Sequence, residues 1–161
     1  MTDNARSLAP KATELLRLHH APEILQVINV WDAVTAKVVA DVPGTNALAT
    51  ASHSIAASRG YEDGENIPLD EMIAAVGVIA AATSLPVSAD LEAGYGNPGE
   101  TVRKAIGAGA VGANIEDQMR PLADAVEQMS AVIRAAEAEG IDFVLNARTD
   151  AFLKGKDRDP A

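Results

Sequence analysis

The 161-residue chain has no cysteine, few aromatic residues and an excess of negative charge. Without cysteine, disulfides, thiolate zinc sites and cysteine nucleophiles are excluded. Because aromatic residues make up only 3% of the chain, we expect alanine, valine, isoleucine and leucine to fill its core. The formal net charge of −10 argues against a nucleic acid or an anionic membrane as a partner. An anionic substrate stays open, since a bound cation can invert the local field.

Long apolar runs are also absent. The most apolar stretch, residues 73–82, is far too short to span a bilayer. The beginning of the chain, MTDNARSLAPKATELL, has no apolar core of signal-peptide length. We therefore expect a soluble, cytoplasmic protein, with the length of one ordinary domain and enough apolar residues for a core.

Short apolar runs alternate with helical patterns along the chain. We expect strands over residues 24–30, 47–51, 86–89, 111–115 and 143–147, and helices over residues 5–20, 33–40, 54–59, 68–83, 100–107 and 122–139. The apolar runs do not alternate with polar residues, which is typical of parallel strands buried on both faces. The fold class is therefore α/β, with either a doubly wound sheet or a (β/α)8 barrel.

Polar residues follow nearly every expected strand, and they favour the barrel. They are Asp32, Ser52-His53-Ser54, Asp90 and Glu92, Glu116-Asp117, and Arg148-Thr149-Asp150. A TIM-type barrel brings all of these strand ends to one rim, where active sites lie. A doubly wound sheet would concentrate them near one switch point.

The length of the chain conflicts with a whole barrel, which needs about 250 residues. We therefore expect residues 1–161 to be the N-terminal portion of a single α/β-barrel domain that holds about the first five βα units. The polar run over residues 154–161 is typical of a loop before another helix. A complete five-stranded domain with a polar tail is the alternative.

The stretch VSADLEAGYGNPGE, residues 87–100, allows two interpretations. Its glycines fit the G-x-G-x-x-G pattern of dinucleotide-binding loops, but such a loop follows its strand directly. Here Asp90 and Glu92 lie between the strand and the glycines, and they would repel a diphosphate unless a metal intervened. Carboxylate oxygens suit Mg2+, and Glu116 would lie nearby on the barrel rim. We predict a metal site at these three acids, and a glycine-rich turn explains the glycines in either case.

Other residues at the strand ends suit an anion. Arg148 is either a bidentate clamp for a carboxylate or phosphoryl group or the partner of Asp150 or Glu116 in an ion pair. The stretch 52–54 offers hydroxyls and backbone N–H groups. Trp31 either walls the pocket or fills the core.

Five stretches in order resemble the isocitrate lyase/phosphoenolpyruvate mutase superfamily. They are NVWDAVTAKVV, ATASHSIAASRGYEDGE, PVSADLEAGYGNP, GAVGANIEDQ and LNARTDAF, and the resemblance covers essentially residues 24–153. It implies an α/β barrel of about 250–300 residues. It also implies a Mg2+ cofactor, for which Mn2+ is an alternative.

The resemblance implies roles for single residues. Asp90 would be the principal metal ligand, and Glu92 stands where many members have the second aspartate of D-x-D. Asp63 would help to hold the waters of the metal, and Glu116 would belong to the same site. Substrate would contact Ser52, His53, Ser54, Trp31 and Arg148, and the residues closest to catalysis would be Arg148, Glu116 and Asp63.

One departure from the family narrows the function. Lyases that act on isocitrate or methylisocitrate carry a K-[KR]-C-G-H lid after IEDQ, whereas Gln118 is followed here by MRPLAD. The phosphoenolpyruvate mutase-like branch is therefore favoured. The function implied is a Mg2+-dependent C–C or C–P bond lyase, mutase or hydrolase. It would act on a small 2-oxo or 2-hydroxy carboxylate through a metal-stabilised enolate, in a homo-oligomer. The alternative is a non-catalytic fragment that binds ligand or assembles with a partner.

Overall fold

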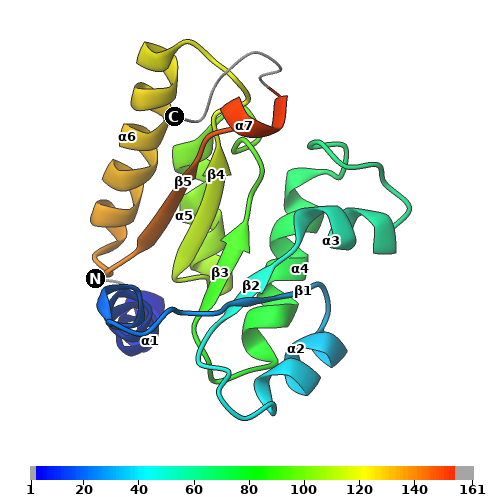
Figure 1. The fold of residues 1–161 in the computed structure, drawn as a ribbon, viewed down its shortest axis with the longest axis vertical. Coiled ribbons are helices and arrows are strands. Elements are labelled where there is room, and N and C mark those ends of the chain that lie inside the picture. Colours follow the sequence, from blue (N-terminus) through cyan, green and yellow to red (C-terminus); the bar gives the residue numbers. More distant parts are fainter. Residues whose placement is uncertain (1–2, 155–161) are drawn as a thin grey trace.

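The computed structural model of the chain describes residues 3–154, which form an open, curved sheet covered by helices (Figure 1). Five parallel strands follow one another in chain order across the sheet of this part of the chain. They are β1 (Ile28–Val30), β2 (Leu48–Thr50), β3 (Val87–Asp90), β4 (Gly112–Glu116) and β5 (Val144–Arg148). The order never reverses, so this sheet has no switch point of the doubly wound kind. The prediction of an α/β barrel fold is confirmed, and the described residues supply five parallel strands of it.

Helices follow the strands. They are α2 (Ala33–Ala40), α3 (Ser52–Ser58), α4 (Leu69–Ala81), α5 (Pro98–Ala108), α6 (Leu122–Glu139) and the short α7 (Ala151–Lys154). The segment expected to form a polar loop lies outside the described residues, apart from Lys154. No helix among residues 3–154 combines the length and the apolar character that a bilayer crossing needs.

Local sequence signals set the ends of these helices. The Asp32 side chain accepts a hydrogen bond from the Thr35 backbone, and the Thr35 hydroxyl accepts one from the Asp32 backbone, which closes a capping box before α2. Gly140 ends α6 with a φ of 72°, a left-handed conformation that favours glycine. The predicted bounds of both helices, residues 33–40 and 122–139, are confirmed.

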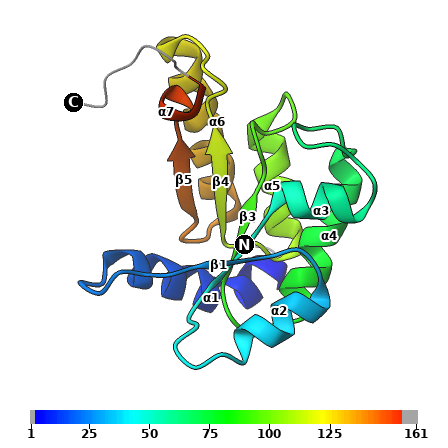
Figure 2. The ribbon, with the colours of Figure 1, turned by 45° about the vertical axis from the view of Figure 1, so that its right-hand side comes forward.

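The helix α1 (Asp3–His20) lies across the amino ends of the strands, opposite the predicted rim (Figure 2). The Lys11 ammonium donates to the Thr83 carbonyl before β3, and the Thr13 hydroxyl donates to Asp142 before β5. A Cβ at Gly112, the first residue of β4, would lie 2.9 Å from a Leu15 methyl carbon. The same Cβ would lie 2.9 Å from the Val144 carbonyl oxygen on β5, so the fixed backbone of the neighbouring strand requires glycine there. Helix α1 closes this end of the sheet.

The sheet differs from the apolar strands that the sequence predicts. On β3 and β4, its helix-covered face is apolar and buried, as Ala89 and Ile115 show. The strand register places Ser88 beside Gly112 and Asp90 beside Asn114 on the other face. That face is partly polar. Strand β1 is also shorter than predicted, and Ile24 before it is 90% exposed.

Candidate functional site

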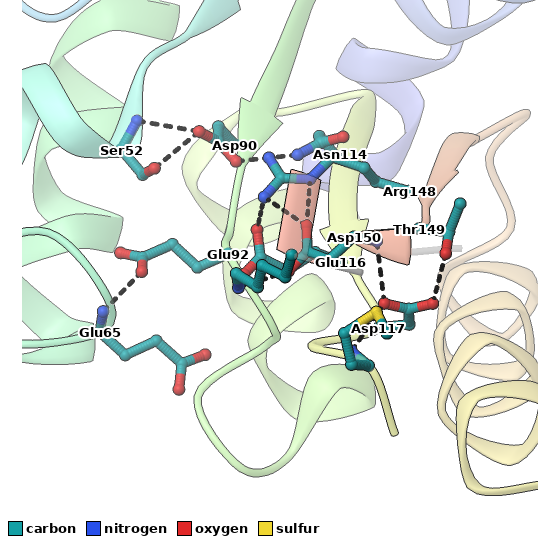
Figure 3. A network of polar contacts seen from close by, with 12 residues as sticks. Ser52, Glu65, Asp90, Glu92, Asn114, Glu116, Asp117, Arg148, Thr149 and Asp150 are labelled. Atoms are coloured by element: carbon teal, nitrogen blue, oxygen red, sulfur yellow. Dashed lines mark hydrogen bonds and ion pairs between the residues drawn. The ribbon is translucent and has the colours of Figure 1, made fainter. Parts of the chain in front are cut away.

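Three neighbouring strands bring polar side chains to the concave face of the sheet. Asp90 lies beside Asn114, Asn114 lies beside Asn146, and Glu116 lies beside Arg148 in the strand register. A cavity of about 380 Å³ opens over this face and is lined by Asp90, Asn114, Asn146 and Arg148, among others. The carboxyl ends of β3, β4 and β5 thus form one rim (Figure 3).

Asp90 is held by three hydrogen-bond donors. Its Oδ2 accepts from the Ser52 backbone N–H at 3.1 Å and from the Ser52 hydroxyl at 2.6 Å. Its Oδ1 accepts from Asn114 Nδ2 at 3.0 Å. The Asp90 backbone N–H donates to the Thr50 hydroxyl at 2.9 Å, so main chain and side chain are both fixed.

Glu92 turns toward a different partner, the loop that carries Glu65. The Glu65 backbone N–H donates to Glu92 Oε2 at 2.5 Å, and Glu65 Oε1 accepts from the Tyr95 backbone N–H at 2.7 Å. Glu65, Glu92 and Tyr95 all have positive φ, between 53° and 62°, a costly conformation for residues other than glycine. Figure 3 shows the Glu92 side chain directed to Glu65 and away from Glu116.

Burial and like charges act together on Glu92, which is only 5% exposed. Desolvation raises the pKa of its carboxyl group above the ordinary value, and the charges of Asp63, Glu65 and Asp90 raise it further. The hydrogen bond from the Glu65 backbone opposes this shift. We call Asp63, Glu65, Asp90 and Glu92 the acidic side of the rim. Among residues 3–154, no lysine or arginine forms an ion pair with any of the four.

On the other side of the rim, cations of the protein itself pair with two of the three carboxylates. The Arg148 guanidinium forms ion pairs with Glu116 and with Asp150, the latter at 3.1 Å. Lys154 contacts Asp150 at 2.5 Å and Glu116 at 3.7 Å. Burial alone would favour a neutral Asp117, but the backbone N–H groups of Asp150 and Met119 and the Thr149 hydroxyl lower the pKa of its carboxyl group. We call Glu116, Asp117, Arg148, Asp150 and Lys154 the ion-paired side.

The predicted metal ligands are therefore divided between the two sides. Within the described part of the chain, no three His, Cys, Asp or Glu side chains gather closely enough to hold a metal ion. The donor chemistry nevertheless fits Mg2+, which binds oxygen atoms and completes its shell with waters around one or two carboxylates. Asp90 and Glu92 provide such oxygens on the side that lacks a cation, whereas Glu116 already pairs with Arg148.

The remaining predicted residues have different surroundings. Ser52 is buried and contacts Asp90 directly, whereas His53 and Asp63 are exposed and Ser54 is half-buried. Trp31 is 39% exposed and does not fill the core. Arg148 pairs with Glu116 and with Asp150, as the ion-pair interpretation of this residue predicted.

Some residues of the site escaped the sequence reasoning. Asn114 and Asn146 are single amides inside apolar strands, and only the register brings them to Asp90. Buried Gln128 on α6 donates to the Ala93 carbonyl at 2.6 Å and accepts from Arg120 at 2.7 Å. The sequence does offer one signal for these residues: each is a polar residue at a position where the surrounding pattern is apolar.

The glycines after β3 have structural reasons of their own. Gly94 has a φ of 88°, and a Cβ there would lie 2.5 Å from the Cβ of Pro98. A Cβ at Gly99 would lie 3.1 Å from the Ala131 carbonyl oxygen on α6. A tight turn and close helix packing thus explain these two glycines without a nucleotide.

Comparison with known proteins places these observations in a family. The family model described as phosphoenolpyruvate phosphomutase matches residues 15–161. The chain is 32% identical to the 2-methylisocitrate lyase of Vibrio cholerae over 96% of its own length and 55% of that protein. It spans about half the length of the curated relatives that it matches.

Solved structures show the same family resemblance. A Burkholderia cenocepacia protein with a provisional assignment as a phosphonomutase is 43% identical with a TM-score of 0.87, over 92% of this chain and 64% of that chain. Oxaloacetate acetylhydrolase in complex with its product oxalate is 28% identical with a TM-score of 0.82, over 89% of this chain and 55% of that chain.

Proposed function

The chain belongs to the phosphoenolpyruvate phosphomutase family, within the isocitrate lyase/phosphoenolpyruvate mutase superfamily, and we propose that it forms the metal-binding part of a Mg2+-dependent enzyme. The family acts on small carboxylates as lyases and mutases. The reaction proposed here is cleavage or transfer at a C–C or C–P bond of a small 2-oxo or 2-hydroxy carboxylate. The mutase-like branch is favoured because the chain has no cysteine after Gln118.

The division of the rim into an acidic and an ion-paired side carries this proposal. A carboxylate substrate would be repelled by Asp90 and Glu92 unless a cation lay between them. Arg148 lines the same cavity as Asp90 and is 36% exposed, so its guanidinium remains accessible to an anion. The geometry therefore supports a cation at the end of β3 with an anion beside it.

The residues of this chain would share the work as follows. Asp90, oriented by Ser52, would be the direct metal ligand, Glu92 would be a further ligand, and Asp63 would help to hold waters of the metal. Glu116 completes the site from β4 and keeps Arg148 in place through their ion pair. Arg148 and the 52–54 stretch hold the anionic end of the substrate.

A bound Mg2+ would supply positive charge to the carboxylate and carbonyl oxygens of the substrate and stabilise the enolate. Mn2+ is a chemically similar substitute. The protein contributes orientation, because Asp90 keeps its direction through hydrogen bonds that do not depend on the metal.

Turnover by the complete protein that contains these residues tests the proposal. With phosphonopyruvate, oxaloacetate and methylisocitrate as a panel, we expect Mg2+-dependent activity on at least one substrate and its loss after EDTA. Asp90→Ala should be inactive, whereas Asp41→Ala, at the exposed end of α2, should be active. Inactivity of the wild-type protein toward the whole panel would favour the alternative, a non-catalytic fragment that binds ligand or assembles with a partner.

We also propose that residues 1–161 form the N-terminal portion of a single barrel domain. Apolar side chains lie exposed beside both edges of the sheet, at Val34 and Val38 on α2 and at Val126 and Ile133 on α6. Further βα units or a second subunit would cover them, which supports a homo-oligomer. The cytoplasmic location expected from the sequence stays a prediction.

A further inference from the structure

We propose that Asn114 and Asn146 are positioning residues that fix the Asp90 carboxylate through a relay of side-chain amides across three strands. Asn146 Nδ2 donates to Asn114 Oδ1 at 2.9 Å, and Asn114 Nδ2 donates to Asp90 Oδ1 at 3.0 Å. The three residues are direct neighbours in the registers of β3, β4 and β5. Figure 3 shows the contact between Asp90 and Asn114.

The charge of Asp90 sets the direction of the whole relay. An ionised carboxylate only accepts hydrogen bonds, so Asn114 must turn its NH2 group toward Asp90. The Asn114 carbonyl then faces Asn146, which must in turn present its own NH2 group. Each amide has one orientation that satisfies its neighbour. The relay therefore has a single polarity, which ends on Oδ1 of Asp90.

The relay also determines which oxygen of Asp90 stays available. Oδ2 accepts from both the backbone and the hydroxyl of Ser52, whereas within residues 3–154 Oδ1 accepts only from Asn114. A carboxylate offers about four acceptor positions, two on each oxygen. One position on Oδ1 therefore remains for a further partner. Rotation of the carboxylate would break the bonds to Ser52 and Asn114 together.

This inference rests on the proposed function, in which Asp90 is the direct metal ligand. Groups that orient a metal ligand typically change metal affinity about 10–100-fold when they are replaced. Asn114→Leu removes the direct contact and keeps the branched shape of the side chain, so we expect the Kd for Mn2+ to rise about 10-fold or more. Asn146→Leu acts through Asn114 and should raise it by less, about 3-fold.

Asn29 on β1 provides a matched control. It lines the same cavity, but its side chain donates to the Thr50 carbonyl at 3.3 Å instead of joining the relay. Asn29→Leu should therefore leave the Mn2+ affinity unchanged. A purely structural role for Asn114 would lower the melting temperature without changing the Mn2+ affinity of the folded protein.

The experiment titrates the complete protein and the three variants with MnCl2 by calorimetry, at a temperature where circular dichroism shows each to be folded. Weaker Mn2+ binding in Asn114→Leu, a smaller loss in Asn146→Leu and no loss in Asn29→Leu support the relay. Wild-type affinity in folded Asn114→Leu overturns it.

A second measurement needs neither metal binding nor a folded Asn114 variant. In ¹⁵N–¹H spectra, Asp90→Ala should shift the side-chain NH2 signals of both Asn114 and Asn146 and leave those of Asn29 in place. An Asn146 signal that ignores the loss of Asp90 overturns the relay. If the wild-type protein binds no Mn2+, the metal assignment fails, and this measurement alone decides on the relay.

Discussion

The acidic side and the ion-paired side of the rim lie next to each other, yet their carboxylates are held in different ways. On the ion-paired side, Arg148 and Lys154 neutralise Glu116 and Asp150. On the acidic side, the described residues offer backbone, hydroxyl and amide donors but no cation.

The pKa shifts of one carboxyl group on each side have opposite directions. Burial and neighbouring charges raise the pKa of Glu92, whereas hydrogen bonds outweigh burial and lower the pKa of Asp117. The protein thus supplies cations to one side itself, through Arg148 and Lys154. The other side carries an electrostatic cost that an external cation would relieve.

The largest effect expected is that of the cation itself. A divalent ion that binds only the folded state at about 100 times its Kd adds about 2.7 kcal/mol to the free energy of unfolding. We expect Mg2+ to stabilise the complete protein on this scale, and Asp90→Ala to abolish the effect. Urea denaturation with and without Mg2+ measures it. Equal stabilisation of wild type and Asp90→Ala would show that the ion binds elsewhere.

Removal of the arginine would test the ion-paired side. Arg148→Met leaves Glu116 and fully buried Asp150 with Lys154 as their remaining cation. We expect the free energy of unfolding to fall by about 2 kcal/mol, less than for a fully buried pair because Arg148 is 36% exposed. Arg134→Met, which breaks an exposed pair with Glu127 on α6, should cost less than about 1 kcal/mol. Equal losses in the two variants would mean that the rim pairs contribute no more than surface pairs.

Neutralising Glu92 should stabilise the protein at neutral pH. The unfolded state ionises near the ordinary value of 4.5, whereas the folded state keeps its proton to a higher pH. The resulting cost is absent below 4.5, grows as the pH rises toward the folded pKa, and is constant above it. Glu92→Gln should therefore gain about 1 kcal/mol at pH 7 and nothing at pH 4. Thermal unfolding at both pH values measures this, with exposed Glu137→Gln as control; a gain that does not depend on pH would contradict the account.

Asp117 should show the opposite dependence with a smaller effect. Its lowered pKa contributes stability above the ordinary value of 3.8, which is lost as the pH falls through the folded pKa. Asp117→Asn should cost about 0.5–1 kcal/mol at pH 7, and the difference from wild type should shrink in acid. A stability difference between Asp117→Asn and wild type that grows toward low pH would contradict the lowered pKa of Asp117.

Most of the fold was predictable because local signals and tertiary packing agree. The capping residue Asp32 and Gly140 fixed the ends of α2 and α6, and apolar runs marked the strands. Strand β1 was overestimated because Ile24 is apolar but lies exposed. Hydrophobicity alone does not reveal whether a neighbouring strand is present to pair with.

The residue types of the candidate site were predictable from the sequence, but the hydrogen-bond partners of these residues were not. The order of the strands brings Asp90, Glu92 and Glu116 to one rim. The direction of Glu92 depends on a backbone N–H 27 residues earlier in the chain, in a loop with its own positive φ. The partners of Asp90 depend on the register with Asn114. Such long-range contacts leave no local pattern in the sequence.

Oxalate binding by the complete protein tests the central claim, that the acidic side needs a cation to accept an anion. Oxalate is a planar dianion that can chelate a divalent ion through two oxygens, as the enolate of pyruvate would. Calorimetry should detect oxalate binding with Mg2+ and none after EDTA. Asp90→Ala should lose it, and Arg148→Lys should weaken it while Mg2+ still binds, because lysine lacks the planar fork. Equal oxalate affinity with and without the metal, or normal binding by Asp90→Ala, would contradict the account.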